Sequence, residues 1–117
     1  MPDLRSEGQL NSCNFVGRVG KDVRFFQTYD PEITRVEFSI CCWGEKSKPT
    51  WVKCKFSESK TWPDERTAFI TSGRMIAVSG SISVEAWLSA DSTANAALVC
   101  SVKVWSFCDG VKAKPKA

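Results

Sequence analysis

The chain has 117 residues, of which 43% are hydrophobic and 25% are charged, with only seven glycines and five prolines. A chain of this length forms one domain, because it can bury roughly two-thirds of its unfolded surface in one core. The composition excludes disordered, collagen-like and low-complexity proteins. The formal charge of +3 matches the lysines at 112, 114 and 116, and the other 13 basic residues balance the 13 acidic ones. The net charge therefore identifies no partner.

Membrane insertion and secretion are not expected. The apolar runs are far shorter than the ~18–20 residues that cross a bilayer, and residues 1–8 lack the apolar part of a secretory signal. The six cysteines are therefore expected to be free thiols, because disulfides belong mainly to secreted proteins.

Apolar and polar residues alternate with a period of two over most of residues 10–108, a pattern typical of half-buried strands. We expect these residues to form the folded domain, between a flexible arm at 1–9 and a flexible lysine-rich tail at 109–117. A first strand over 10–19 would carry on one side Cys13, Phe15, Gly17 and Val19. Residues 23–27 are compatible with a short second strand.

The next two predicted strands, 34–43 and 50–57, each carry a tryptophan on the side away from the core. The first has an apolar face made of Val36, Phe38, Ile40 and Cys42, and Trp43 faces outward. The second places Val52, Cys54 and Phe56 inside, and Trp51, Lys53, Lys55 and Ser57 outside. An aromatic ring and two ammonium groups therefore share one surface.

Residues 63–72 are the one stretch with helical features. Pro63 and two acids fall in its first turn, and Gly73 follows as a C-terminal cap. We expect a helix of about three turns there.

Two long strands complete the chain, at 74–88 and about 97–107, and Gly80 allows the first to bend. The expected inward residues of the first are Ile76, Val78, Ile82, Val84, Ala86 and Leu88, with Glu85 and Trp87 outward. The expected inward residues of the second are Leu98, Cys100, Val102 and Val104, with Lys103, Trp105 and Phe107 outward. This order of elements predicts an all-β fold with one short helix, a small closed or nearly closed Greek-key barrel.

Catalytic chemistry finds little support in the sequence. There is no histidine, which removes the commonest general base at neutral pH. Gly17 and Gly20 lack the partners of a phosphate-binding loop, and no Cys-x-x-Cys spacing suggests zinc. The acids at 64–65 are typical of a helix start. We expect no catalytic residue, no metal site and no cofactor.

Aromatic and basic residues are concentrated in one region. Residues 43–62 contain five lysines against two glutamates, together with Trp43, Trp51, Phe56 and Trp62. This mixture is typical of surfaces that bind single-stranded nucleic acid, because rings stack on bases and cations contact phosphates. Phe56 has inward parity and Trp62 adjoins the helix start, so both also suit structural roles. Arg18, Lys21 and Arg24 form a second basic set.

The outward tryptophans also allow a different interpretation. Exposed aromatic residues mark protein interfaces as well as ligand surfaces. A protein-interaction module, with these tryptophans in a subunit or partner interface, is therefore the alternative.

Several segments resemble bacterial-type single-stranded DNA-binding proteins over about residues 10–107. The segments are Asn14-Phe-Val-Gly-Arg-Val-Gly-Lys-Asp22, Phe38-Ser-Ile-Cys-Cys-Trp43, Thr50-Trp-Val-Lys53, Ser72-Gly73 and Val78-Ser-Gly-Ser-Ile-Ser-Val-Glu-Ala-Trp87. The resemblance implies a five-stranded OB-fold barrel that binds single-stranded DNA without strong sequence preference in replication, repair and recombination. It also implies a homotetramer, with a dimer as the alternative, in the cytoplasm, or in an organelle if a transit peptide has been removed.

The resemblance also implies site residues. The family's stacking tryptophans match Trp43, Trp51 and Trp87, and its next basic position matches Lys53. Lys55 lies on the same face, and Arg18 and Lys21 fall in the family's basic first-strand region. The family's stacking phenylalanine would fall at Ser57, one residue from Phe56, and Trp62 is a candidate substitute.

Two departures from the family pattern affect the expected partners. The long tail with an acidic, aromatic-ended tip is replaced by a lysine-rich end, so recruitment of proteins through such a tip is not expected. A short chain without this tail also resembles the primosomal relatives of the family, which are dimeric OB-folds that bind single strands and helicase-loading partners.

Overall fold

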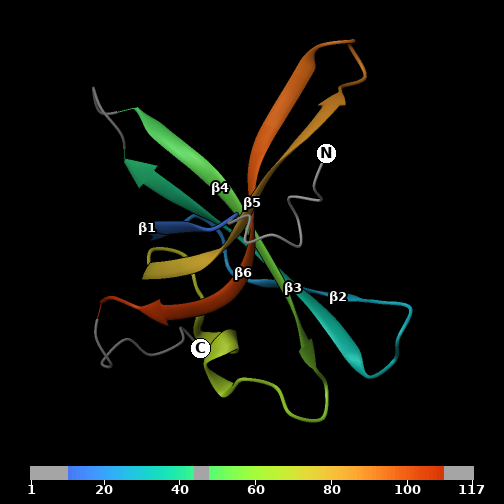
Figure 1. The fold of residues 1–117 in the computed structure, drawn as a ribbon, viewed down its shortest axis with the longest axis vertical. Helices are drawn as coiled ribbons and strands as arrows, with labels where there is room; N and C mark the ends of the chain where they lie inside the picture. Colours follow the sequence, from blue (N-terminus) through green and yellow to red (C-terminus); the bar gives the residue numbers. More distant parts are fainter. Residues whose placement is uncertain (1–10, 44–47, 110–117) are drawn as a thin grey trace, which may run out of the picture.

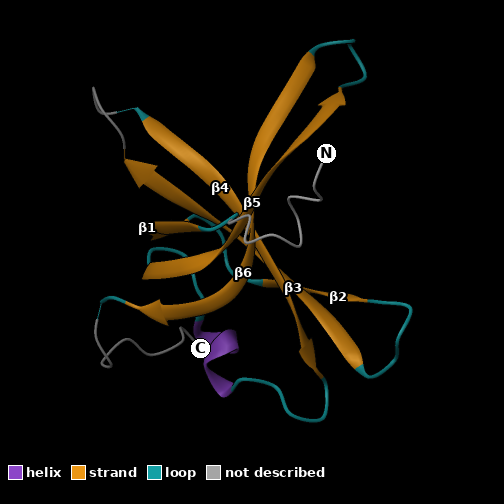
Figure 2. Cartoon of the chain, in the orientation of Figure 1, coloured by secondary structure: helices purple, strands orange, loops and turns teal. Residues whose placement is uncertain are grey.

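The computed structural model describes residues 11–43 and 48–109, which form one sheet and one short helix (Figures 1 and 2). The strands are β1 (Cys13–Val19), β2 (Arg24–Gln27), β3 (Ile33–Trp43), β4 (Pro49–Ser59), β5 (Met75–Leu88) and β6 (Ala94–Phe107), and a 3-10 helix spans Glu65–Phe69. Among these residues no helix is long and apolar enough to cross a membrane.

The sheet closes on itself to form a barrel. Its strands are hydrogen-bonded in the order β1-β5-β6-β4-β3-β2, and β1 also pairs with β3 through Arg18 opposite Cys41 and Val19 opposite Ile40. Strands β4 and β6 are parallel, and every other pair is antiparallel. The short β2 lies at the edge of β3. The predicted all-β barrel is confirmed, with five long strands and this short sixth one.

The core consists of inward residues of five strands, β1, β3, β4, β5 and β6, and of the segment after the helix. Its buried members are Val19, Phe38, Ile40, Val52, Cys54, Ile70, Ile76, Val78, Cys100 and Trp105. The expected alternation is confirmed in β1, β3 and β4, where the inward residues are buried or half-buried. All six cysteines are free, and burial raises the pKa of Cys100 to about 12. Cys100 is therefore protonated and acts as a small apolar side chain.

Trp105 is buried, which corrects the expectation that it faces outward. It is only 8% exposed, whereas Val104, expected inside, is 68% exposed. The cause is a β-bulge. Ser79 pairs with Val104 but Gly80 pairs with Val102, so β6 contains one additional residue and its alternation inverts. The strands approach closely here: a Cβ on Gly80 would lie 1.9 Å from the carbonyl oxygen of Ser101.

The far halves of β5 and β6 form a hairpin that extends beyond the core. Val84 and Leu88, both expected to be buried, are 64% and 72% exposed. Their alternation is the expected one, and they lie on the side opposite Trp87. None of the described strands covers that side of the hairpin, which projects away from the barrel in Figure 1. An apolar face identified by parity is therefore buried only where the barrel reaches it.

The expected helix of about three turns at 63–72 is wrong. Only a five-residue 3-10 helix forms, in which Thr67 and Ile70 donate backbone bonds to the carbonyls three residues earlier. Thr67, Ile70 and Thr71 are β-branched residues, which lower helix propensity. Gly73, with φ +91, serves the turn before β5 rather than a helix end, because the Arg74 N–H donates to the carbonyl of Thr71.

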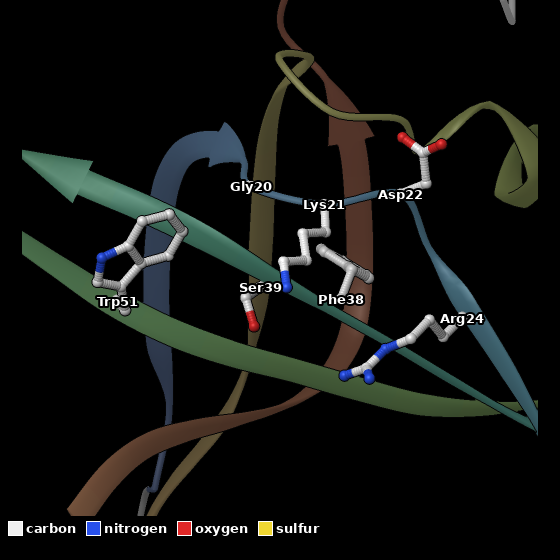
Figure 3. A pocket seen from close by; sticks show the side chains of 7 residues that line it. All are labelled: Gly20, Lys21, Asp22, Arg24, Phe38, Ser39 and Trp51. Atoms are coloured by element: carbon white, nitrogen blue, oxygen red, sulfur yellow. The ribbon is translucent and has the colours of Figure 1, made fainter.

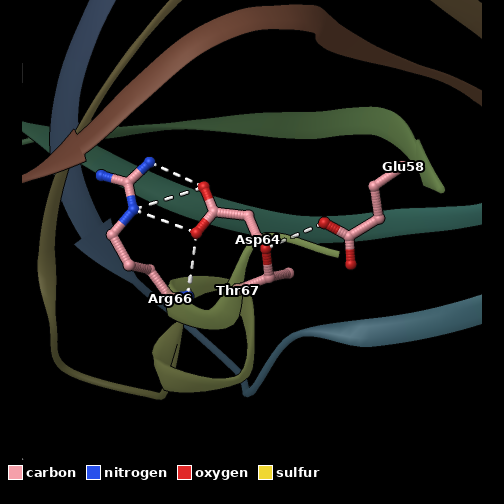
Figure 4. A network of polar contacts seen from close by, with 4 residues as sticks. All are labelled: Glu58, Asp64, Arg66 and Thr67. Atoms are coloured by element: carbon pink, nitrogen blue, oxygen red, sulfur yellow. Dashed lines mark hydrogen bonds and ion pairs between the residues drawn. The ribbon is translucent and has the colours of Figure 1, made fainter. Parts of the chain in front are cut away.

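Side chains fix this short helix beneath the barrel (Figure 4). Asp64 caps it by accepting from the Arg66 N–H, and the Arg66 guanidinium lies 2.7 Å from the same carboxylate. The hydrogen bond from Arg66 lowers the pKa of Asp64. The buried Thr67 hydroxyl donates to Glu58 on β4 at 3.1 Å. The 3-10 helix is therefore attached to the sheet through its middle residue.

The expected arm at 1–9 and almost all of the expected tail lie outside the described residues. Asp109, the first residue of that tail, is described. Its carboxylate pairs with the nearly buried Arg74 guanidinium at 2.9 Å. This ion pair ties Asp109 to Arg74 at the start of β5.

Candidate nucleic-acid interface

Three half-exposed tryptophans stand on two hairpins that diverge from one side of the barrel. Trp43 and Trp51 belong to the β3–β4 hairpin, and Trp87 to the β5–β6 hairpin (Figure 1). Their exposed fractions are 66%, 53% and 51%. Each lies on the outward side of its strand. The positions next to it in the sequence have inward parity, and that inward side of the strand is buried where the barrel covers it. We call this set of three the tryptophan surface.

Lys53 and Lys55 follow Trp51 on the outward side of β4, between the two hairpins. The register places Lys53 opposite Ser39 and Lys55 opposite Glu37 on β3. Both side chains are about one-third exposed, and neither ammonium group is isolated. Lys53 Nζ lies 3.5 Å from a carboxylate oxygen of Glu37 and 3.5 Å from one of Glu85, and Lys55 Nζ lies 3.3 Å from the other oxygen of Glu85. The expected basic surface is therefore an ion-pair network.

The two glutamates of this network differ in their surroundings. Glu37 shares the outward side of β3 with Trp43, yet it is only 6% exposed, because it is covered by its contacts with Arg35 at 2.7 Å and with Lys53. Glu85 is exposed, on β5. The hydrogen bond from Lys55 and the charge of Lys53 hold the pKa of Glu85 below its usual value. Both lysines therefore face an ionised carboxylate at neutral pH.

A pocket of about 350 Å³ lies beside Trp51 (Figure 3). Its lining residues are Gly20, Lys21, Asp22, Arg24, Phe38, Ser39 and Trp51. Lys21 and Arg24 contribute cations at its rim, and Trp51 forms one wall. The expected basic residue Lys21 is thus next to the tryptophan surface. The pocket combines an aromatic wall with positive charge, which suits a base and its phosphate.

Gly20 determines where the Trp51 ring lies. A Cβ added to Gly20 would lie 2.6 Å from Cζ3 and 2.9 Å from Cη2 of the indole. The ring therefore packs directly on the backbone at Gly20. No other residue could stand there without moving the ring.

The substitution Gly20→Ala is expected to displace the indole and to weaken oligonucleotide binding, by less than the removal of Trp51 does. The fold should persist, because the ring is exposed and can rotate away. Fluorescence titrations of Gly20→Ala, Trp51→Ala and the double variant provide the measurement. The double variant should bind as weakly as Trp51→Ala, and additive losses would show that Gly20 acts independently of the ring.

Trp62 lies apart from the tryptophan surface, whereas Arg18 lies two strands from Trp51, because Arg18 pairs with Cys41 and Cys41 pairs with Trp51. Arg18 is exposed on β1, and its guanidinium donates to the carbonyl of Gly73 at 3.0 Å. Trp62 is 84% exposed and follows the end of β4, where its N–H donates to the Ser59 hydroxyl. Trp51 is near the start of that strand, so about 26 Å of extended chain separates Trp51 from Ser59.

Phe56 has inward parity, as the sequence indicated, and stacks on Trp105 at 6.5 Å between ring centroids. It also lines a second pocket of about 350 Å³, together with Arg35 and Lys55. This pocket lies where the pairing of β4 and β6 ends, at Lys55 and Ser101. Phe56 therefore belongs to the core and is not on the tryptophan surface, although a gap between strands leads to it.

Sequence reasoning missed the contributions of Gly20 and of the two glutamates. The outward parity of Glu37 and Glu85 placed both carboxylates on the face of the lysines, which was the available signal. Residues 11–43 and 48–109 contain no group of three or more metal-ligating side chains.

No family model and no curated protein matches the sequence. Several solved structures match its fold. The Plasmodium falciparum SSB in complex with ssDNA is 21% identical, with a TM-score of 0.66 over 93% of this chain and 100% of that chain. The mitochondrial single-stranded DNA-binding protein of S. cerevisiae is 14% identical, with a TM-score of 0.58 over 86% and 96% of the two chains. The small single-stranded DNA-binding protein of Streptomyces coelicolor is 10% identical, with a TM-score of 0.64 over 85% and 95%. The barrel is an OB-fold, as expected.

Proposed function

We propose that the chain binds single-stranded DNA without sequence preference and protects it during replication, repair and recombination. The observation that carries this proposal is the tryptophan surface, where three exposed indoles on two hairpins flank the lysines of β4. The similar fold of a Plasmodium protein in complex with ssDNA supports it. Every base has a π-face, so stacking on indoles requires no particular sequence.

In this mechanism the residues divide into two groups. Trp43, Trp51 and Trp87 stack on bases, and each stack contributes about 1–3 kcal/mol. Lys53, Lys55 and Lys21 contact phosphates near these rings. Arg18, Phe56 and Trp62 are secondary candidates, since the Arg18 guanidinium donates to the carbonyl of Gly73, Phe56 packs against the core and Trp62 lies beyond the end of β4. Binding, rather than covalent chemistry, is the function that this arrangement supports.

We further propose a homo-oligomer, with a tetramer as the first expectation and a dimer as the alternative. Val16 on β1 and Val104 on β6 are 56% and 68% exposed. Both point outward, on either side of β5, because Val16 pairs with Ala77 and Val104 with Ser79. Exposed apolar residues grouped in this way are typical of subunit interfaces. Sedimentation of the free protein separates monomer, dimer and tetramer.

The proposed function is tested by titration with oligo(dT) while tryptophan emission is followed. Saturable quenching is expected, because bases that stack on exposed indoles quench them. Affinity should fall with salt, with a log–log slope of about −0.7 for each phosphate neutralised. Emission that does not change even at low salt would contradict the proposal and would favour a protein interface for the tryptophans.

A further inference from the structure

Glu85 forms ion pairs with Lys53 and Lys55, the two β4 lysines that the proposed function assigns to phosphates. One carboxylate oxygen lies 3.5 Å from Lys53 Nζ, and the other lies 3.3 Å from Lys55 Nζ. Two oxygens of one anion thus contact two neighbouring ammonium groups. A phosphate of a bound strand would use two of its own oxygens in the same way.

Glu85 can leave this position, whereas Glu37 cannot. The Glu37 side chain is 8% exposed and is held by Arg35 at 2.7 Å as well as by Lys53. The Glu85 side chain is 41% exposed and contacts only the two lysines among the described charged groups. Exposed ion pairs of this kind are weak. Of the two carboxylates, Glu85 is therefore the one that an incoming anion can replace.

The Glu85 contacts also connect the two hairpins. Strand β6 lies between β4 and β5 in the sheet, so the ion pairs cross the outward face of β6. Val99 in the middle of β6 has the outward parity of Lys53, with which it pairs, yet it is fully buried. Two residues beyond Glu85, on the same side of β5, stands Trp87. The carboxylate therefore lies directly on the path between the stacking tryptophans of the two hairpins.

We propose that Glu85 is an internal competitor of the DNA backbone, which occupies the phosphate position between Lys53 and Lys55 until a strand displaces it. This inference rests on the proposed function. Binding then exchanges one anion for another at the lysines, so the lysines contribute less to affinity than two free cations would. In the wild type, stacking should therefore supply most of the affinity. Lys53 and Lys55 should contribute little to the salt dependence of binding.

The test compares Glu85→Gln with Glu65→Gln in the full chain. Both substitutions remove one negative charge, but Glu65 is an exposed residue in the 3-10 helix, at the other end of the barrel (Figure 1). Oligo(dT) affinity is measured by tryptophan quenching over a range of salt concentrations. Far-ultraviolet circular dichroism verifies that each variant is folded.

We expect Glu85→Gln to bind about threefold to tenfold more tightly than wild type at low salt. Its log–log salt slope should be more negative by about 0.7–1.4, the value for one or two additional phosphates. Glu65→Gln should leave the slope unchanged. If both variants bind oligo(dT) with the same affinity and the same salt slope, the role proposed for Glu85 is wrong, and the proposed function is not affected. Absence of binding by the wild type and both variants would instead overturn the proposed function.

Discussion

Replacing Trp51 by alanine is expected to weaken oligo(dT) binding by about 1–3 kcal/mol, which is roughly fivefold to 150-fold in Kd. The indole is half-exposed and forms one wall of the pocket beside Lys21, so its removal eliminates a stacking platform. The fold should be little affected, because the ring packs on the surface at Gly20 rather than in the core. Quenching titrations give the affinity, and chemical unfolding gives the stability.

Trp62→Ala is the matched control for this prediction. Trp62 is also a tryptophan exposed at the surface, but it lies beyond the far end of β4. Its removal should change affinity much less than the removal of Trp51. A similar loss in both variants would extend the DNA path around the barrel to the 3-10 helix. A large unfolding defect in Trp51→Ala would show that the indole is structural.

Replacing Trp105 by alanine is expected to lower the free energy of unfolding by about 3–5 kcal/mol. The ring is 8% exposed, stacks on Phe56 and contacts the edge of Phe107 at 5.1 Å between centroids. The Arg66 guanidinium covers its face at 4.3 Å. Removing the indole therefore leaves a cavity in an aromatic cluster and removes one contact of the 3-10 helix that carries Arg66.

Denaturant unfolding monitored by circular dichroism measures this loss. The conservative variant Trp105→Phe keeps an aromatic ring and should retain more of the stability. At low temperature, where the alanine variant is still folded, its oligo(dT) affinity should resemble that of the wild type. A loss of less than about 1 kcal/mol would contradict the buried position of the ring.

The barrel was predictable because its evidence is local and repeated. Alternation in β1, β3 and β4 identified the inward side chains, and the outward parity of Trp43, Trp51 and Trp87 identified the tryptophan surface. These features depend only on the period of a strand, which is two everywhere in a regular sheet. Closure by pairing of β1 with β3 agreed with the expected topology.

The errors occurred where structure depends on contacts between distant residues. Parity cannot show how far a strand extends past its core, so Val84 and Leu88 were placed inside although none of the described strands covers them. Helical signals at Pro63 and Gly73 were genuine turn signals, but tertiary contacts of Thr67 favoured a 3-10 helix. The count of lysines in residues 43–62 also said nothing about the carboxylates that pair with them.

The additional residue in β6 has a consequence for comparing this chain with its structural neighbours. Residues 94–102 and 104–107 follow two different inward–outward assignments, separated at Lys103. An alignment with a relative that lacks the bulge must place a one-residue gap there, or else Trp105 will be matched with a surface position. A gap at any other position would assign Trp105 to the ligand face instead of the core. At low identity the gap position, rather than residue similarity, therefore decides which aromatic positions correspond between the proteins.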